Sequence, residues 1–354
     1  MLTPDVEKAV ASHESFVPRK LVHRLSISEV LMTDARRTGR NTYICGAQWP
    51  RWHVFYENRP FGFDTALIEE TLRQATILVC HKFYDVPFDY HFLLLRMRFA
   101  IGHQCAMSQI EPEELSLNLR FDRIRYQGKR LFACRSRAQL KARGQTIGYA
   151  SADARIVTPP VYQRMRGATM PELDVSVEGR AKGRADGRAD ISAEARAGVR
   201  ADISAEGPAG VRLVGEFPDD GAPATGPIPA PAVGKTSAWN VCIGPPTSAF
   251  HWPLLVDTSN PVFFDHPLDH TPGMLLLESM RQAVRLALAD PSADFDSLDA
   301  KFTSFVEIGL PADIRLASGA ELPEPRSRFR LSVVQGDAEC VVAEVTVAED
   351  HPEA

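Results

Sequence analysis

Two stretches of the chain carry the apolar spacing of a covered helix. They run from about Thr65 to Lys82 and from about Met274 to Ala289, and in both the apolar residues recur every three or four positions. The stripes consist of Ile68, Leu72, Ala75 and Val79 in the first stretch and of Leu276, Met280, Ala283, Val284 and Ala287 in the second. Apolar residues flank both stripes, so each helix must be largely surrounded by other elements.

Each predicted helix is followed by stretches in which apolar and polar residues alternate, as they do in half-buried strands. These stretches are residues 92–101, 117–126, 130–140 and 146–157 in the first half, and 301–308, 312–317, 328–335 and 340–349 in the second. One long helix followed by antiparallel strands therefore occurs twice. This order predicts an α+β fold in which an antiparallel sheet wraps a central helix, with the two units packed as an internal pseudo-dimer.

Residues 166–235 separate the two units and lack the composition of a core. Gly, Ala, Arg, Asp and later Pro dominate, and one phrase recurs as ADISAEARAGVR (189–200) and ADISAEGPAGVR (201–212). Two such copies bury too little apolar surface for a solenoid, so the segment is predicted to be a flexible linker that does not contact substrate. The predicted domains are residues 15–165 and 236–350.

The bulk composition indicates a soluble globular protein. Of 354 residues 44% are apolar, the formal net charge is -5, and no uncharged apolar run approaches a membrane span of roughly 18 residues. This charge gives no general attraction to nucleic acid or anionic lipid, and the chain starts without a secretory pattern, so we expect a cytoplasmic protein that binds neither nucleic acid nor membrane. The six scattered cysteines predict reduced thiols, and we expect no metal and no cofactor.

The phrase E-x-x-R-Q-A occurs once in each predicted helix. It places Glu70, Arg73 and Gln74, and again Glu278, Arg281 and Gln282, on one side of the helix beside the apolar stripe. Two interpretations are open. A Glu–Arg pair on a solvated face would contribute only a few tenths of a kcal/mol, about the strength of an ordinary helical ion pair. A glutamate withdrawn from water would instead have a raised pKa and act as a general base, with the arginine binding a phosphate or an oxyanion.

The loop before the second helix, FFDHPLDHTPG at 263–273, carries His266, Asp269 and His270. Three roles are open for them: a metal site, which the prolines disfavour, a structural or capping role, and acid–base chemistry or substrate positioning. The first half has FGFDTA at this place, with Asp64 and no histidine, so two sites would be unequal. Arg51 and His53 are second-rank candidates. The sequence contains no phosphate loop, dinucleotide glycine fingerprint or G-x-S-x-G motif.

Four motifs in order resemble the AfsA family, the A-factor biosynthesis proteins built from two hot-dog domains. They are KLVHRLSISEVLMTD (20–34), GAQWPRWHVFY (46–56), DTALIEETLRQA (64–75) and PVFFDHPLDHTPGMLLLESMRQA (261–283). The resemblance covers both halves and omits the linker. PGMLLLESMRQ is also similar to the helix start of hot-dog hydroxyacyl-carrier-protein dehydratases, but the upstream histidine of those enzymes falls on Phe264 here, which argues against dehydration.

The resemblance implies an acyltransferase that moves a β-ketoacyl group from an acyl-carrier-protein thioester to a hydroxyl of dihydroxyacetone phosphate, in the synthesis of a γ-butyrolactone signal. Glu70 or Glu278 would take the proton from the attacking hydroxyl, and Arg73 or Arg281 would bind the phosphate or the tetrahedral oxyanion. Backbone N–H groups at the helix start, at Gly273, would polarise the thioester carbonyl. The remaining residues expected to contact the substrates are Asp64, Gln74, His266, Asp269, His270 and Gln282.

The first helix entry departs from the family pattern. Phe63-Asp64-Thr65 stands where the family is expected to have H-D-P, so contacts at the first helix entry differ. Both Glu–Arg pairs are kept as candidate sites, with a slight preference for the second because it adds His266 and His270. The alternatives are a thioesterase, which would send water to the same carbonyl, and a non-catalytic protein that binds an acyl ligand.

Overall fold

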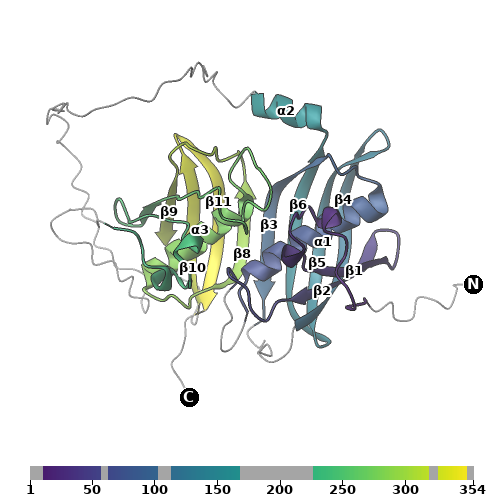
Figure 1. Ribbon diagram of the computed structural model, residues 1–354, viewed down its shortest axis with the longest axis horizontal. Helices are drawn as coiled ribbons and strands as arrows, with labels where there is room; N and C mark the ends of the chain where they lie inside the picture. The colour runs from purple at the N-terminus through teal and green to yellow at the C-terminus, as the bar shows by residue number, and fades with distance from the viewer. Residues whose placement is uncertain (1–10, 57–62, 103–112, 168–225, 319–325, 349–354) are drawn as a thin grey trace, which may run out of the picture.

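The fold is organised around one antiparallel sheet of eleven strands. The computed structural model describes residues 11–56, 63–102, 113–167, 226–318 and 326–348. Within them the strand order is β1-β2-β4-β5-β6-β3-β8-β11-β10-β9-β7, so each half of the chain supplies one continuous side of the sheet. The two long helices lie on the same face of the curved sheet, each against the strands of its own half (Figure 1).

The chain supplies these elements in two successive sets. The first half contributes β1 (Met32–Arg37), β2 (Thr42–Trp49), α1 (Ala66–Tyr84), β3 (His91–Ile101), β4 (Glu113–Gln127), β5 (Arg130–Ala142), β6 (Gln145–Val157) and the short α2 (Pro159–Gly167). The second half contributes β7 (His251–Pro253), α3 (Gly273–Leu288), β8 (Phe295–Phe302), β9 (Asp313–Ser318), β10 (Arg326–Gln335) and β11 (Ala338–Ala348). Short 3-10 helices precede the long helices: η2 (Arg19–Val22) and η3 (Ile27–Glu29), then η4 (Ala230–Val233) and η5 (Ala238–Asn240).

Both long helices form where the apolar spacing predicts them. Helix α1 is buried around most of its circumference, and its polar residues Glu69, Glu70 and Gln74 are buried with the apolar ones. Because buried polar groups need hydrogen-bond partners, these three side chains must be satisfied inside the protein. None of the described helices has the length and apolarity that crossing a membrane would require.

The two halves are joined by hydrogen bonds between β3 and β8. Met97 faces Ala300 and Phe99 faces Leu298 in this register, which continues the sheet without a gap. Asp299 on β8 accepts hydrogen bonds from Arg96 and Arg98 on β3. A single sheet shared by two helix-and-sheet units confirms the predicted α+β fold of two hot-dog domains packed as a pseudo-dimer.

The strand prediction is wrong between residues 303 and 308. Strand β8 is Phe295–Phe302, and the residues after it form a loop. The alternation there has another cause, since Val306 is buried at 1% exposure and its carbonyl accepts the N–H of Thr271 in the loop before α3.

The end of the predicted linker is folded. Residues 226–235 include η4, and Val233 is fully buried in the main core. Arg285 of α3 donates to the Val233 carbonyl at 2.8 Å, which ties this segment to the helix. The predicted linker boundary at residue 235 therefore differs from the structure, because a proline- and alanine-rich composition does not exclude packing. The repeated phrase at 189–212 lies outside the described residues.

Candidate functional site

Helix α1 holds Glu70 in a clamp of three side chains. Arg73 donates from Nε to Oε2 at 2.8 Å and from Nη2 to Oε1 at 2.9 Å, and Gln74 donates from Nε2 to Oε1 at 2.6 Å. Arg24, from the segment that follows η2, lies 2.7 Å from the same Oε1. The Glu70 side chain is 1% exposed, so its partners are all supplied by the protein.

These contacts determine the protonation state of Glu70. Burial alone would raise its pKa, but the positive charges of Arg24 and Arg73 outweigh burial and lower the pKa to about 2. The raised pKa predicted from the sequence is therefore wrong for Glu70. An ionised carboxylate with its lone pairs occupied has little tendency to take up a proton. The geometry makes it an anchor that orients the two arginines.

Arg73 keeps part of its guanidinium free on the outer side of the clamp. Its side chain is 25% exposed. Nη2 also donates to the Val22 carbonyl at 3.4 Å, while Nη1 makes no hydrogen bond with the described residues. An arginine held by a buried carboxylate, with donors left over, is suited to binding an anion such as a phosphate.

Arg73 lowers the pKa of two partly exposed imidazoles. His266 comes from the loop before α3, and after burial the charge of Arg73 is the main cause that lowers its pKa. His23 follows η2 directly, and its pKa is lowered to about 3 by burial, by His81 and by Arg73. We call Arg24, Glu70, Arg73, His23 and His266 the Arg73 site. It combines the helix of one half with the pre-helix loop of the other.

The second Glu–Arg pair has the same local plan but no access to solvent. Arg281 on α3 donates from Nη1 to Glu278 at 2.7 Å, from Nη2 to Glu69 at 2.8 Å and from Nε to Asp294 at 2.8 Å. The side chains of Arg281 and Glu278 are 0% exposed. The slight preference for this pair rested on His266 and His270 and stays a prediction, but the arginine that lowers the pKa of His266 in the structure is Arg73, and His270 lies beside Asp269.

Lys235 closes the buried pair from the other side. Its Nζ lies 3.2 Å from Glu278 and 3.7 Å from Asp64, and it donates to the Phe55 carbonyl at 3.1 Å. Burial would raise the pKa of Glu278, but Lys235 and Arg281 outweigh burial and lower it, so the raised pKa predicted for this residue is also wrong. Asp64, expected to contact substrate, is fully buried in this charge cluster.

Glu69 is a carboxyl of this cluster whose pKa is raised. Burial is the largest cause, and Asp294 and Glu278 add to it, so that the pKa reaches about 8 although Arg281 opposes the change. Its Oε2 has no hydrogen-bond partner among the described residues. Glu69 is not among the candidates predicted from the sequence, because the helical spacing alone does not indicate that α3 packs against this side of α1.

The two glutamines of the repeated phrase hold the chain that leads into each half. Gln74 donates to the Glu29 carbonyl at 2.7 Å and accepts the Leu31 N–H at 2.9 Å. Gln282 donates to the Asn240 carbonyl at 2.8 Å and accepts the Cys242 N–H at 2.8 Å. Both amides are buried and fully engaged in this way, so the structure supports a structural role for them and gives no sign of substrate contact.

Asp269 and His270 contact α2 in the structure. Asp269 accepts hydrogen bonds from the Tyr162 hydroxyl at 2.6 Å and from Arg166 at 3.1 Å, and His270 Nδ1 lies 2.8 Å from the same carboxylate. Gly273 begins α3, and a Cβ there would lie 3.2 Å from the Phe302 ring, so this glycine permits close packing at the helix start.

His53 also has protein partners. Its Nδ1 accepts the Phe55 N–H at 3.1 Å, and its Nε2 lies 3.3 Å from Glu29.

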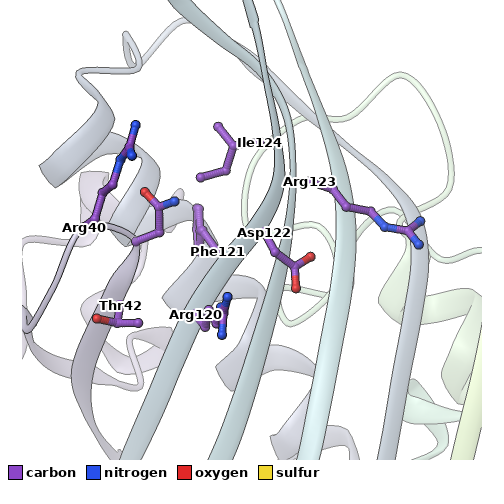
Figure 2. A pocket seen from close by; sticks show the side chains of 8 residues that line it. Arg40, Thr42, Arg120, Phe121, Asp122, Arg123 and Ile124 are labelled. Atoms are coloured by element: carbon purple, nitrogen blue, oxygen red, sulfur yellow. The ribbon is translucent and has the colours of Figure 1, made fainter.

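A surface hollow lies away from both Glu–Arg pairs, beside the turn between β1 and β2 and along β4. Its lining includes Arg40, Arg120 and Arg123 but none of the residues singled out from the sequence. Arg40 and Arg123 extend away from each other in the close view (Figure 2), so their charges do not converge on one point. The hollow does not have the geometry of the predicted site.

The sequence matches a family model described as the A-factor biosynthesis hotdog domain, AfsA, over residues 7–158 and 218–349. The chain belongs to the AfsA family. Among AfsA-type relatives, the 2-oxo-3-(phosphooxy)propyl 3-oxoalkanoate synthase of Streptomyces virginiae is 30% identical over 307 residues, which are 85% of this chain and 87% of the relative. The protein of the same name from Streptomyces griseus is 28% identical over 306 residues, 82% of each chain.

One solved structure aligns with most of this AfsA-family chain at low sequence identity. A protein described as an oleoyl thioesterase from Lactobacillus plantarum aligns with a TM-score of 0.47 and 10% identity, covering 88% of this chain and 97% of that one.

Proposed function

We propose that the chain is an acyltransferase that moves a β-ketoacyl group from an acyl-carrier-protein thioester to a hydroxyl of dihydroxyacetone phosphate. The name of the Streptomyces relatives describes the product of such a reaction. The 2-oxo-3-(phosphooxy)propyl group is the carbon skeleton of dihydroxyacetone phosphate without its free hydroxyl, and a 3-oxoalkanoate is a β-ketoacyl carboxylate, so the named compound is the ester of the two. The reaction exchanges a thioester for an ester and needs no covalent intermediate on the protein.

The Arg73 site is the place that supports this chemistry best, and the free edge of the Arg73 guanidinium is the observation that carries the proposal. The acceptor is a phosphate ester, which calls for a fixed cation next to the attacking hydroxyl. Arg73 is fixed by Glu70 through two hydrogen bonds and is still 25% exposed. Arg281 has the same pairing to its glutamate but is sealed from solvent, so one of the two pairs serves as a site.

The two substrates would meet at the junction between the halves. Arg24, which pairs with Glu70, also donates to the Val262 carbonyl of the loop before α3 at 3.1 Å, so substrates bound here would contact both domains. The first turn of α3 presents backbone N–H groups that can polarise a thioester carbonyl.

The test is to supply a β-ketoacyl thioester on an acyl-carrier protein with and without dihydroxyacetone phosphate and to identify products by mass spectrometry. The proposal predicts the phosphorylated ester, formed only with the acceptor present. Release of free β-keto acid at the same rate without the acceptor would assign a thioesterase instead. Binding of the thioester with no turnover under either condition would assign a non-catalytic acyl-binding protein.

A further inference from the structure

His23 takes a backbone conformation that glycine adopts more easily. Its φ of 53° and ψ of 52° lie in the left-handed region, at the end of η2. The equivalent position at the end of η4 is Gly234, with φ 66°. A Cβ at Gly234 would come within 2.2 Å of the Pro291 carbonyl oxygen, so only glycine fits there. The chain therefore keeps a side chain at this strained position in one half and excludes it from the other.

Hydrogen bonding sets the tautomer of His23. His81 Nδ1 lies 2.7 Å from the Val86 carbonyl, which can only accept, so this nitrogen carries the proton. The Nε2 of neutral His81 must then accept, and it lies 2.8 Å from His23 Nε2. His23 consequently donates from Nε2 and holds a lone pair on Nδ1. No described residue hydrogen-bonds to that Nδ1.

The two chain neighbours of His23 contact residues of the Arg73 site. Val22, the residue before it, accepts a hydrogen bond from Arg73, and Arg24, the residue after it, pairs with Glu70. The titratable groups that face the ring are His81 and Arg73 of α1, His266 of the loop before α3, and His91 of β3. Phe92 of β3 lies edge-on to it, with ring centroids 5.3 Å apart.

We propose that His23 is the catalytic base of the Arg73 site, that His81 is its positioning residue, and that binding of a phosphorylated acceptor at Arg73 switches the base on. This inference rests on the proposed function. The acceptor hydroxyl gives its proton to His23 Nδ1 while its oxygen bonds to the thioester carbonyl carbon. As the tetrahedral intermediate collapses, the C–S bond breaks and the proton passes from His23 to the leaving thiolate.

Electrostatics provides the switch. In the free protein the pKa of His23 is lowered to about 3, by burial first and then by His81 and Arg73. Such an imidazole stays unprotonated at neutral pH but is a weak base. A phosphate dianion bound to Arg73 would offset the positive charge and attract a proton to His23, which raises the pKa of His23 above its value in the free protein. Water brings no such charge, so hydrolysis of the thioester is not promoted.

The activity test uses His23→Gly, because glycine fits the left-handed backbone and the variant is not expected to lose its fold. Ala289→Gly is the matched control: Ala289 is also left-handed, with φ 52° at the exposed end of α3. We expect ester formation to fall about 100-fold to 10,000-fold in His23→Gly, to recover in part with added imidazole, and to be unchanged in Ala289→Gly. Wild-type-like ester formation by His23→Gly would overturn the proposal. If the wild-type protein itself forms no ester, the proposed function fails. If both the wild-type protein and His23→Gly form ester at the same rate, the proposed function stands and only the role of His23 is refuted.

The switch is tested without turnover by nuclear magnetic resonance titration of 15N-labelled histidines. The His23 signal is assigned by its loss in His23→Gly. We expect the pKa of His23 to rise with dihydroxyacetone phosphate and to stay unchanged with unphosphorylated dihydroxyacetone. His81→Asn, which keeps a donor for Val86 but removes the acceptor for His23, should shift the tautomer signature of His23. A His23 pKa that does not change with dihydroxyacetone phosphate would refute the switch. A His23 tautomer that does not change in His81→Asn would refute the positioning role of His81.

Discussion

Arg281 on α3 donates a hydrogen bond from Nη2 to Oε1 of Glu69 on α1 at 2.8 Å, both side chains are fully buried, and this contact joins the helices of the two halves. The same guanidinium holds Asp294, which accepts hydrogen bonds from the N–H and hydroxyl of Thr65 at the start of α1. In the second half, the repeated Glu–Arg phrase therefore stabilises the domain interface. In the first half, its counterpart faces a partly open site.

Replacing Arg281 should cost stability. Arg281→Met leaves Glu278 and Asp294 without their guanidinium, and removing one partner of a buried charge pair typically costs about 3–5 kcal/mol. Arg73→Met is the matched control, because Arg24 still pairs with Glu70 and Arg73 is partly exposed. Urea unfolding should show a loss at least twice as large for Arg281→Met. Equal losses of unfolding free energy in the two variants would mean that the buried pair contributes no more to stability than the exposed pair, and would contradict its role in holding the two halves together.

Gly234 should tolerate no side chain. Gly234→Ala forces an alanine into a left-handed conformation and places its Cβ 2.2 Å from the Pro291 carbonyl oxygen. Gly128→Ala is the control, since Gly128 has a similar φ of 63° and open space around it. The backbone cost of about 1–2 kcal/mol applies to both variants, so the free energy of unfolding should fall further for Gly234→Ala. If both variants lose the same stability, the contact with Pro291 is relieved by movement.

Glu69 should make the protein less stable as the pH rises. Its pKa is about 8 in the folded protein against an ordinary value of 4.5, so the folded state binds a proton that the unfolded state releases. This contribution is complete below about pH 4.5 and is lost as the pH rises through 8. Urea unfolding between pH 5 and about 8.5 should show the decline, and Glu69→Gln should reduce it. A pH dependence that is identical in Glu69→Gln would contradict the raised pKa.

Glu70 should make the protein less stable as the pH falls, which is the opposite of the effect of Glu69. Its folded pKa of about 2 lies below the ordinary value of 4.5, so its contribution to stability is present above pH 4.5 and is lost as the pH falls through 2. Glu70→Gln should therefore weaken the acid-side loss of stability while destabilising the protein at neutral pH, where Arg24 and Arg73 lose their anion. Acid unfolding followed by circular dichroism provides the measurement. An unchanged acid transition in Glu70→Gln would show that other carboxylates determine it.

Helical and alternating patterns were enough to predict the core of each half. The helices and the long strands β4, β5 and β6 carry a strong periodic signal because each has one clearly buried face. Strand β2 carries no such periodic signal, because three consecutive residues, Cys45, Gly46 and Ala47, are all buried and break the alternation. Strand β1 is short and ends in exposed arginines, so its composition resembles that of a loop.

The composition of the Arg73 site could not be read from the sequence because it depends on how the halves pack. His266 precedes Glu278 along the chain, yet its pKa is lowered by Arg73 of the other half, and its loop contacts Arg24. One local signal was available. Val22-His23-Arg24 and Val233-Gly234-Lys235 precede the two long helices in the same way, and comparing them would have drawn attention to His23.

The most direct test of the central claim is the preference for a phosphorylated acceptor, measured as the ratio of kcat/KM for dihydroxyacetone phosphate to that for dihydroxyacetone. For the wild-type protein this ratio should be about 10 to 100, as expected for charged hydrogen bonds that contribute about 1.5–3 kcal/mol. Arg73→Gln should bring the ratio close to one. A preference that survives intact in Arg73→Gln would show that the phosphate binds elsewhere and would contradict the assignment of the site.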